Sequence, residues 1–186
     1  QPTVFDYATG TQWRLAINRL PKTTWFCTAA NIPGITLGEA QYATPMSDMF
    51  ITGDKLTFET LNITFIVDEE LQNYRELWDW MVGIGSPVDH SSWTAELAKG
   101  DGSIKKFASP DEDPRTEVTF EEAQLYSDST LLVYNSKNMP KVEVMFKNLF
   151  PTSLSSLEYS QELTDVEYFK ATATFRYRYY EFRTVS

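Results

Sequence analysis

The chain has 186 residues, and its 26 Asp and Glu residues outnumber its 16 Lys and Arg residues, which leaves a formal net charge of −10. This length is typical of a single domain, and the acidic balance excludes general binding along a phosphate backbone, which requires many cations. The single cysteine, Cys27, and the single histidine, His90, exclude an internal disulfide bond and every zinc site built from several such ligands.

Aromatic content and hydropathy narrow the class of protein further. Aromatic side chains make up 15% of the residues, which favours a β-rich core with large packed contacts. No apolar run reaches the roughly 18 residues that a membrane-spanning helix needs. No basic segment followed by an apolar one marks a secretory signal. We therefore expect a protein that is made in the cytoplasm and has no membrane partner.

Two short segments near the N-terminus have the pattern of strands. Residues 12–18 alternate between apolar and polar side chains, so one face of a strand would be buried. Residues 23–30 are a second candidate strand, and the turn residues between the two segments predict an N-terminal hairpin. Cys27 falls within this second strand and is expected to be a small buried apolar side chain.

The stretch 35–54 is extended, mostly polar and interrupted by glycine and proline. It predicts a projecting hairpin or a long loop that contacts a partner, because loops longer than about 12–15 residues in compact domains are usually functional. An ordinary surface loop is the alternative. Apolar side chains in and just before this stretch fall outside the periodicity of a core, so we expect them to pack against a neighbouring molecule. The candidate interface residues are Ile32, Pro33, Gly34, Ile35, Leu37, Met46, Met49, Phe50 and Ile51.

A strand and a helix are expected next. Residues 56–67 form the clearest strand pattern, with a slip at residues 59–60 that predicts a β-bulge. The helix is expected to begin with Asp68 as its N-terminal cap and to end at the glycines at positions 83 and 85. Its apolar residues recur at helical spacing, so one face should pack on the core. The expected core-facing residues are Leu71, Tyr74, Leu77, Trp78 and Met81.

The C-terminal half is again rich in strand patterns. Residues 131–135 and 141–147 predict a hairpin, and residues 149–154 predict an extended link. Residues 166–182 alternate throughout and predict one long strand with an apolar, aromatic face. Before this half, the composition shifts at about residues 84–117 to Ser, Asp, Gly, Pro and Lys, which predicts a surface insertion.

These elements together predict the fold class. Strands dominate, and one strong helix packs beside them. We expect a mainly β (α+β) fold, namely a β-sandwich or barrel with one flanking α-helix and a long insertion loop. The chain should form a single domain over residues 1–186.

No arrangement of residues in the sequence predicts catalysis. His90 lies in a polar segment without a nucleophile elbow to present a serine, so an exposed loop histidine is preferred over a catalytic one. The acidic run at residues 111–113 lacks the spacing of a calcium loop and is better explained as solvated charge. We expect no cofactor, no metal and no enzymatic activity.

Tryptophans leave one binding function open. Trp78, Trp80 and Trp93 offer aromatic faces on which a sugar ring can stack, which would make the chain a carbohydrate- or cell-surface-binding β-module. The competing interpretation places Trp78 on the inner face of the helix, in the core.

Several stretches, taken in order along the chain, carry a resemblance to a known family. They are Phe50–Leu56, Leu61–Phe65, Asp68–Trp80, Ser136–Pro140, Val144–Phe146, Asn148–Thr152 and Phe169–Phe182. In these stretches the chain resembles the tail-tube proteins of T-even-type contractile-tailed bacteriophages, and as closely the related baseplate proteins that start the tube. The resemblance covers about residues 12–83 and 130–182. The insertion at 84–117 has no match, and the lack of long flanking regions favours a tube component over a baseplate initiator.

The resemblance implies a fold and an assembly. The fold is a β-barrel or sandwich flanked by one helix, shared with the type VI secretion tube protein. The assembly is a homohexameric ring, stacked with further rings into the tail tube of a virion, through which phage DNA passes during ejection without specific binding. Implied partners are further copies of the chain and tail sheath, baseplate or neck proteins, with assembly in the host cytoplasm. A baseplate or neck ring is the alternative, and an acidic lumen would repel DNA.

Overall fold

The computed structural model describes residues 10–85, 125–160 and 168–185. The predicted insertion beyond residue 85, His90, Trp93 and the acidic run at 111–113 therefore lie outside the described residues. The elements in chain order are β1 (Trp13–Ile17), α1 (Pro21–Trp25), β2 (Cys27–Ala30), β3 (Ile35–Ala43), β4 (Asp48–Phe58), β5 (Leu61–Ile66), α2 (Gln72–Gly85), β6 (Ser127–Tyr134), β7 (Pro140–Leu154), β8 (Lys170–Arg176) and β9 (Tyr179–Thr184).

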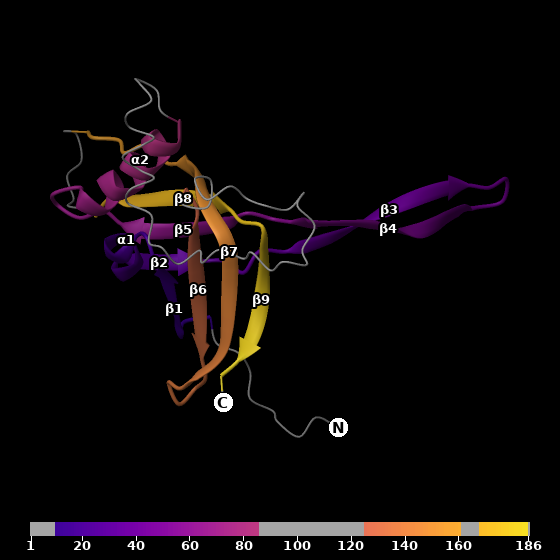
Figure 1. The fold of residues 1–186 in the computed structure, drawn as a ribbon, viewed down its shortest axis with the longest axis horizontal. Helices are drawn as coiled ribbons and strands as arrows, with labels where there is room; N and C mark the ends of the chain where they lie inside the picture. The colour runs from indigo at the N-terminus through magenta and orange to yellow at the C-terminus, as the bar shows by residue number, and fades with distance from the viewer. Residues whose placement is uncertain (1–9, 86–124, 161–167, 186) are drawn as a thin grey trace, which may run out of the picture.

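Seven strands form one strongly bent, open sheet, and two form a separate hairpin. The order in the sheet is β1-β6-β7-β8-β5-β2, with β9 also paired to β7, while β3 pairs with β4. Strands β1, β6, β7 and β9 run nearly at right angles to β2, β5 and β8 (Figure 1). The mainly β fold with a flanking helix is confirmed.

Strand β7 joins the two directions of the sheet. Its first part pairs with β6 and β9, and residues 150–154 pair with β8. The bend coincides with Asn148, whose φ of 55° lies in the left-handed region. Asp128 fixes this point, because its carboxylate accepts the Asn148 N–H at 3.2 Å and pairs with Lys147 Nζ at 2.5 Å. Residues 149–154, expected as a link, are therefore the second half of a strand.

The predicted N-terminal hairpin is wrong. Strand β1 pairs with β6, and β2 pairs with β5 at the other edge of the sheet. Pro21 occupies the first turn of α1, where the missing N–H of proline costs nothing, and Thr24 N–H donates to Leu20 O at 3.0 Å. The segment read as the start of the second strand is thus a short helix that redirects the chain.

Two expected long strands are each divided. Residues 56–67 are not one bulged strand, because β4 ends at Phe58 in the hairpin and β5 begins at Leu61 in the main sheet. The C-terminal strand is interrupted at residues 177–178, where the sheet bends, although Arg178 N–H still donates to Lys147 O on β7. The apolar face predicted for the first part of this strand is confirmed, since Ala171, Ala173 and Phe175 are fully buried.

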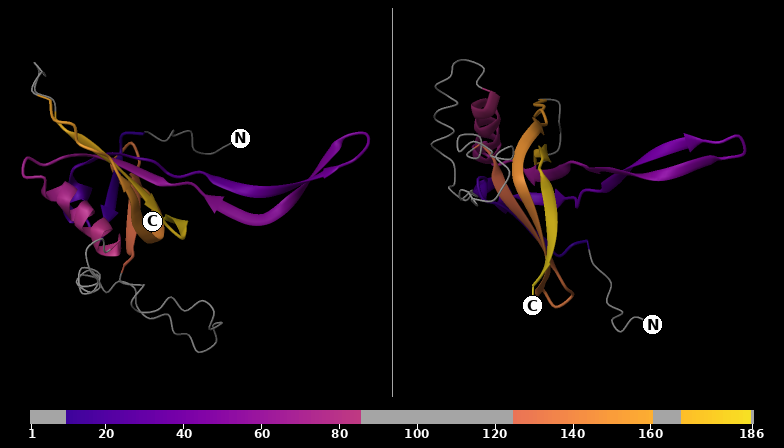
Figure 2. Two further views of the ribbon diagram at one scale, coloured as in Figure 1. Left: turned by 90° about the horizontal axis from the view of Figure 1, so that it is seen from above. Right: turned by 45° about the vertical axis from the view of Figure 1, so that its right-hand side comes forward.

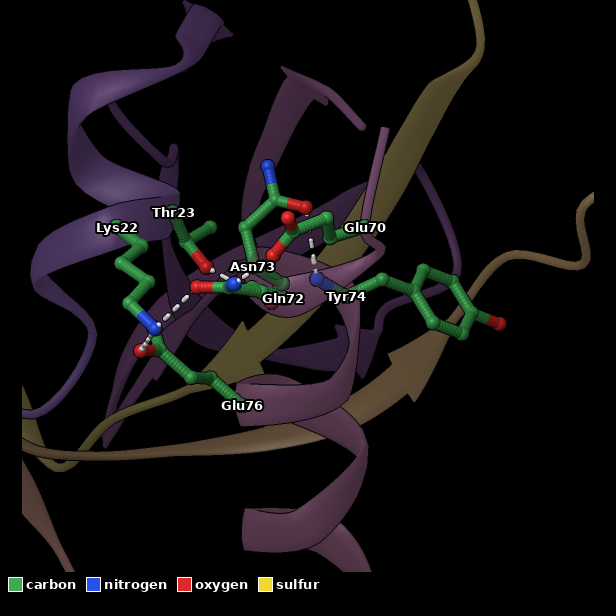
Figure 3. A network of polar contacts seen from close by, with 7 residues as sticks. All are labelled: Lys22, Thr23, Glu70, Gln72, Asn73, Tyr74 and Glu76. Carbon is green, nitrogen blue, oxygen red and sulfur yellow. Dashed lines mark hydrogen bonds and ion pairs between the residues drawn. The ribbon is translucent and has the colours of Figure 1, made fainter. Parts of the chain in front are cut away.

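Helix α2 covers the core but begins four residues later than predicted. Asp68 is not its cap. Leu71 has a φ of 56°, and the buried Asn73 ties the helix start together (Figure 3). The Asn73 carboxamide accepts from the N–H groups of Asp68 and Tyr74 and donates to Ile66 O at 2.7 Å. The helix is thereby fixed to the end of β5.

The inner face of α2 is largely the predicted one, because Leu77 is buried and Tyr74 and Met81 pack against the core, but Trp80 takes the place expected for Trp78. Leu77 and Trp80 are buried, whereas Trp78 is 52% exposed, so its predicted core position is wrong. The Trp80 ring lies tilted against the Phe175 ring, with their centroids 6.3 Å apart, and its indole N–H donates to Leu125 O at 3.0 Å. Because Trp80 is enclosed in this way, it cannot present a face to a sugar.

Candidate assembly surface

The β3–β4 hairpin, residues 35–58, projects far from the rest of the molecule, and we call it the arm (Figures 1 and 2). Its two strands pair with each other along their length. Within the described residues no other element packs extensively against it. An isolated two-stranded hairpin is at best marginally stable in water, so this shape points to a partner that covers it.

Along both strands of the arm, large apolar side chains are exposed. Cross-strand neighbours share a face, and four pairs along the arm are apolar. Large apolar side chains exposed on a monomer in this number mark a contact surface. The arm exposes Ile35, Leu37, Tyr42, Met46, Met49, Phe50, Ile51 and Leu56.

Two glycines set the geometry of the arm where its register shifts. Between the pairs Leu37↔Leu56 and Glu39↔Thr52, β4 contains two more residues than β3. Gly53 packs directly on the backbone of Gly38, and a Cβ at position 53 would lie 2.8 Å from Gly38 O. Only glycine permits this approach, so Gly53 fixes how the outer half of the arm is placed relative to its base.

The tip of the arm is an ordered turn. The Thr44 hydroxyl donates to Ser47 O and accepts the Ser47 N–H. Behind it, Gln41 Nε2 donates to Asp48 Oδ2 at 2.7 Å. Met46 stands at the apex with 96% of its surface exposed. A flexible thioether in this position can adapt to the shape of an apolar pocket on a partner.

The base of the arm is held to the body by a small set of contacts. Glu59 N–H donates to Gly34 O at 3.0 Å, and Gly34 N–H donates back to the Glu59 carboxylate at 3.2 Å. The Tyr180 hydroxyl on β9 donates to Pro33 O at 3.0 Å. Both chain ends of the arm are therefore held to the body at its base, and beyond the base the arm makes no extensive contact with the other described elements.

A cluster of aromatic rings lies directly under this base. Phe58, the last residue of the arm, contacts the rings of Tyr177 and Tyr180, and Phe146 packs against both tyrosines. The Tyr177 hydroxyl is buried without a hydrogen-bond partner among the described residues. Burial, followed by the neighbouring Tyr180 and Glu59, raises the pKa of Tyr177 to about 12.

The structure brings most of the predicted interface residues together on one element. Ile35 and Leu37 lie on β3, Met46 at the tip, and Met49, Phe50 and Ile51 on β4, while Ile32 and Gly34 lie at the base and Pro33 is buried there. Sequence reasoning missed Tyr42 and Leu56. Each faces a predicted interface residue across the hairpin, Tyr42 facing Met49 and Leu56 facing Leu37. The register of the hairpin was therefore the missing signal.

The described residues contain neither a cluster of metal ligands nor a reactive thiol. None of them gather into a group of three or more metal-ligating side chains. Burial raises the pKa of the Cys27 thiol to about 11, which keeps it protonated and unreactive at neutral pH. None of the helices in the described ranges is long and apolar enough to cross a membrane.

The acidic charge of the chain is unevenly distributed. The described residues contain 13 of the 26 acidic side chains but 12 of the 16 basic ones, a net charge of −1. The remaining charge of −9 belongs to residues 1–9, 86–124 and 161–167. The acidity of the whole chain is therefore not a property of the sheet, the helices or the arm.

Comparison with known proteins gives one family and one group of folds. The sequence profile described as phage tail tube protein matches residues 8–183. No curated protein matches the chain. A structure of the sheath–tube complex of PVC, an extracellular contractile injection system, contains a chain that is 15% identical with a TM-score of 0.56, covering 98% of this chain and 95% of that one.

Two further solved structures contain similar chains. One, from the PVC sheath/tube terminator, is 14% identical with a TM-score of 0.57, covering 97% of this chain and 99% of that one. The other, from the tube-terminating cap of the anti-feeding prophage, is 14% identical with a TM-score of 0.52, covering 100% and 96%. At these identities the likeness establishes the fold.

Proposed function

The chain belongs to the phage tail tube protein family, and on that premise we propose that its copies assemble into homohexameric rings that stack into a tail tube. The proposed assembly unit is a single domain over residues 1–186, with the segment 84–117 as an insertion directed at other tail proteins. The protein acts as a structural component of the virion and carries out no catalysis.

The arm is the observation that carries this proposal. It exposes eight large apolar side chains on a hairpin that makes no extensive contact with its own body. Burying one such side chain stabilises a complex by roughly 1.5–3 kcal/mol. Contact of the arm with a neighbouring copy would therefore stabilise the assembly. The proposed interface consists of Ile32, Pro33, Gly34, Ile35, Leu37, Met46, Met49, Phe50 and Ile51, together with Tyr42 and Leu56.

Phage DNA is the proposed cargo of the lumen during ejection. A near-neutral body gives the phosphate backbone no strong attraction and no array of cations to hold it. Tail sheath, baseplate or neck proteins are the proposed outer partners, which agrees with the sheath–tube complex that contains a chain of similar fold. Assembly takes place in the host cytoplasm, before the particle is released.

A second candidate function is a ring at the end of the tube, such as a baseplate, neck or terminator ring. The observation that favours it is that similar chains occur in a tube-terminating cap and in a sheath/tube terminator, at TM-scores close to that of the sheath–tube complex. An end ring would stop after one ring or two. A tube protein would continue into tubes of variable length and uniform width.

The proposal is tested by light scattering on the purified chain, with negative-stain images of the same fractions. Rings or tubes of uniform width with a central hole are the expected result, and single rings would select the end-ring function. A particle of 21.4 kDa that also fails to join a supplied tail tube or baseplate would contradict both.

A pair of variants on one strand tests the role of the arm. Ile35→Asp places a charge on an apolar face of the arm and should prevent assembly. Thr36→Asp places the same charge on the opposite face, at a pair formed with Thr57, and should assemble as the wild type does. Equal assembly of the two variants would show that the base of the arm is not part of the interface.

A further inference from the structure

We propose that the tip of the arm of one copy docks into a groove between β1 and β2 of a second copy of this chain. This inference rests on the proposed function, because it names the surface that receives the arm. The groove lies between two of the edge strands of the open sheet, next to α1, and has a volume of about 490 Å³.

The side chains that line the groove include the residue types that most often contribute binding energy at the centre of a protein interface. Trp13 and Arg14 line it from β1, and Trp25 and Thr28 line it from the other side. Tryptophan and arginine are the residue types that most often dominate binding energy. Trp25 is 78% exposed, although it is the largest side chain on α1, and nothing in the described residues covers it.

The charges of the arm and of the groove are complementary. The arm contains three carboxylates, Glu39, Asp48 and Asp54, against one lysine. The groove contains Arg14 and no acidic residue among its lining side chains. Arg14 has no carboxylate partner among the described residues. An incoming Asp48, next to the tip, would therefore supply a counter-charge to Arg14.

The apolar chemistry of the two surfaces also matches. Met46 is the most exposed apolar side chain of the described residues and stands at the apex of the arm. A methionine sulfur packs well against aromatic rings, and the groove offers two indoles. The tip is narrow and ordered, because its turn is closed by hydrogen bonds between Thr44 and Ser47. It can therefore enter a groove without first losing much conformational freedom.

The positions of the two surfaces allow such contacts to be repeated from copy to copy. The arm extends from one side of the body, and α1 with the β1 and β2 edges lies on the other side (Figure 1). A molecule that carries a projection on one side and its receptor on the other associates head to tail. Head-to-tail contacts close into rings when the rotation permits and continue into open stacks when it does not.

Mixing two complementary variants tests the inference. In the first variant residues 38–55 are replaced by Asn-Gly, a two-residue hairpin turn that joins the Leu37↔Leu56 pair and leaves the groove intact. In the second, Arg14→Glu and Trp25→Ala change two exposed groove residues and leave the arm intact. Each variant alone should be monomeric, and a 1:1 mixture should give a heterodimer and nothing larger, because only one competent arm and one competent groove remain.

The matched control carries Lys137→Glu and Met139→Ala, which make the same kind of change on the exposed β6–β7 turn. It should assemble as the wild type does. A groove variant that still assembles like the wild type, or a mixture that forms no heterodimer, overturns this inference and leaves the proposed function standing. A wild type that stays monomeric and joins no supplied tube overturns the proposed function and this inference with it.

Disulfide trapping gives a second readout that does not depend on weakening the interface. In a Cys27→Ala background, Met46→Cys at the tip and Thr28→Cys in the groove should produce a reducible ladder of covalent multimers in assembled particles. The control pair is Met46→Cys with Met139→Cys, which should give no ladder. Assembled particles in which the groove pair yields no more crosslink than the control pair would overturn the docking.

Discussion

The body and the arm of this protein use apolar side chains in opposite ways. In the body, Leu61, Ile63 and Phe65 of β5 are turned inward and lose essentially all contact with solvent. In the arm, Met49, Phe50 and Ile51 of β4 lie on a strand of similar composition and remain more than half exposed. Strand β4 ends just before residues 59–60 and strand β5 begins just after them. The difference in exposure therefore arises from the strands with which each of them pairs, and not from their position along the chain.

This difference agrees with the proposed function, in which the body is complete within one chain and the arm is covered by a neighbouring copy. Strand β5 is paired on both sides, and its apolar residues lie in the same buried core as Leu77 and Trp80 of α2, so its apolar face is satisfied within one chain. Strands β3 and β4 have only each other. Substitutions in the body should therefore change the free energy of unfolding, whereas substitutions in the arm should change assembly.

The largest expected effect is on the body. Phe65→Ala removes a fully buried ring from the core, and we expect the free energy of unfolding to fall by about 3–5 kcal/mol. Phe50→Ala removes the same ring from the arm and should change that free energy by less than about 0.5 kcal/mol while weakening assembly. Urea unfolding of the two monomers gives the comparison. Equal destabilisation would show that the arm is part of the core.

Next in size is the loss of a buried polar anchor. Asn73→Ala leaves the N–H groups of Asp68 and Tyr74 and the carbonyl of Ile66 without their partner, and should cost about 2–3 kcal/mol. The neighbouring exposed residue supplies the control, since Gln72→Ala should cost less than about 0.5 kcal/mol. A small effect of Asn73→Ala would mean that water replaces the carboxamide and that the start of α2 is not fixed by it.

A smaller effect is expected where the arm changes register. Gly53→Ala brings a Cβ against the Gly38 carbonyl, which should destabilise the arm locally by about 1–3 kcal/mol and reduce assembly. Hydrogen exchange of the arm amides measures the local change. Gly85→Ala, with no described atom within 4 Å of the new Cβ, should leave both arm and assembly unaltered. Unchanged exchange in Gly53→Ala would show that the register can shift freely.

The smallest effect concerns the junction of body and arm and depends on pH. Because burial raises the pKa of Tyr177 to about 12 from 10.0, the unfolded chain releases this proton first, and the wild type should lose stability between about pH 10 and pH 12. Tyr177→Phe removes the buried, unpartnered hydroxyl and should make stability less dependent on pH in this window. The two proteins are compared by urea unfolding at pH 8 and pH 11. Parallel losses would show that Tyr177 does not titrate in this range.

Sequence patterns located most strands but not their pairing. Alternation identifies β1, β5 and β8 because one face of each is buried, and this signal is local. The pairing of β1 with β6 joins residues more than 100 positions apart, so the N-terminal hairpin was predicted where a short helix stands. Trp78 was misplaced for a related reason. Trp78 and Trp80 are both compatible with apolar spacing, and the tertiary contacts of Trp80 with Phe175, Leu125 and Arg19 decide which of them is covered.

The arm was predictable because its apolar residues lack the periodicity of a buried core. Apolar side chains at 46–51 have no core periodicity, and that alone marked them as interface candidates. The register shift at Gly38 and Gly53 hid the cross-strand pairs, so Tyr42 was missed although it faces Met49. The groove between β1 and β2 gave no sequence signal, because it forms between segments separated by α1.

The most direct measurement is an electron cryo-microscopy reconstruction of assembled particles in which individual subunits are resolved. We expect a ring with rotational symmetry in which every arm is covered by a neighbouring copy, with Met46 against Trp25 and Asp48 near Arg14. Subunits that join only through the edges of their main sheets, with the arms extending uncovered into solvent, would contradict the central claim that the arm is where copies of this chain meet.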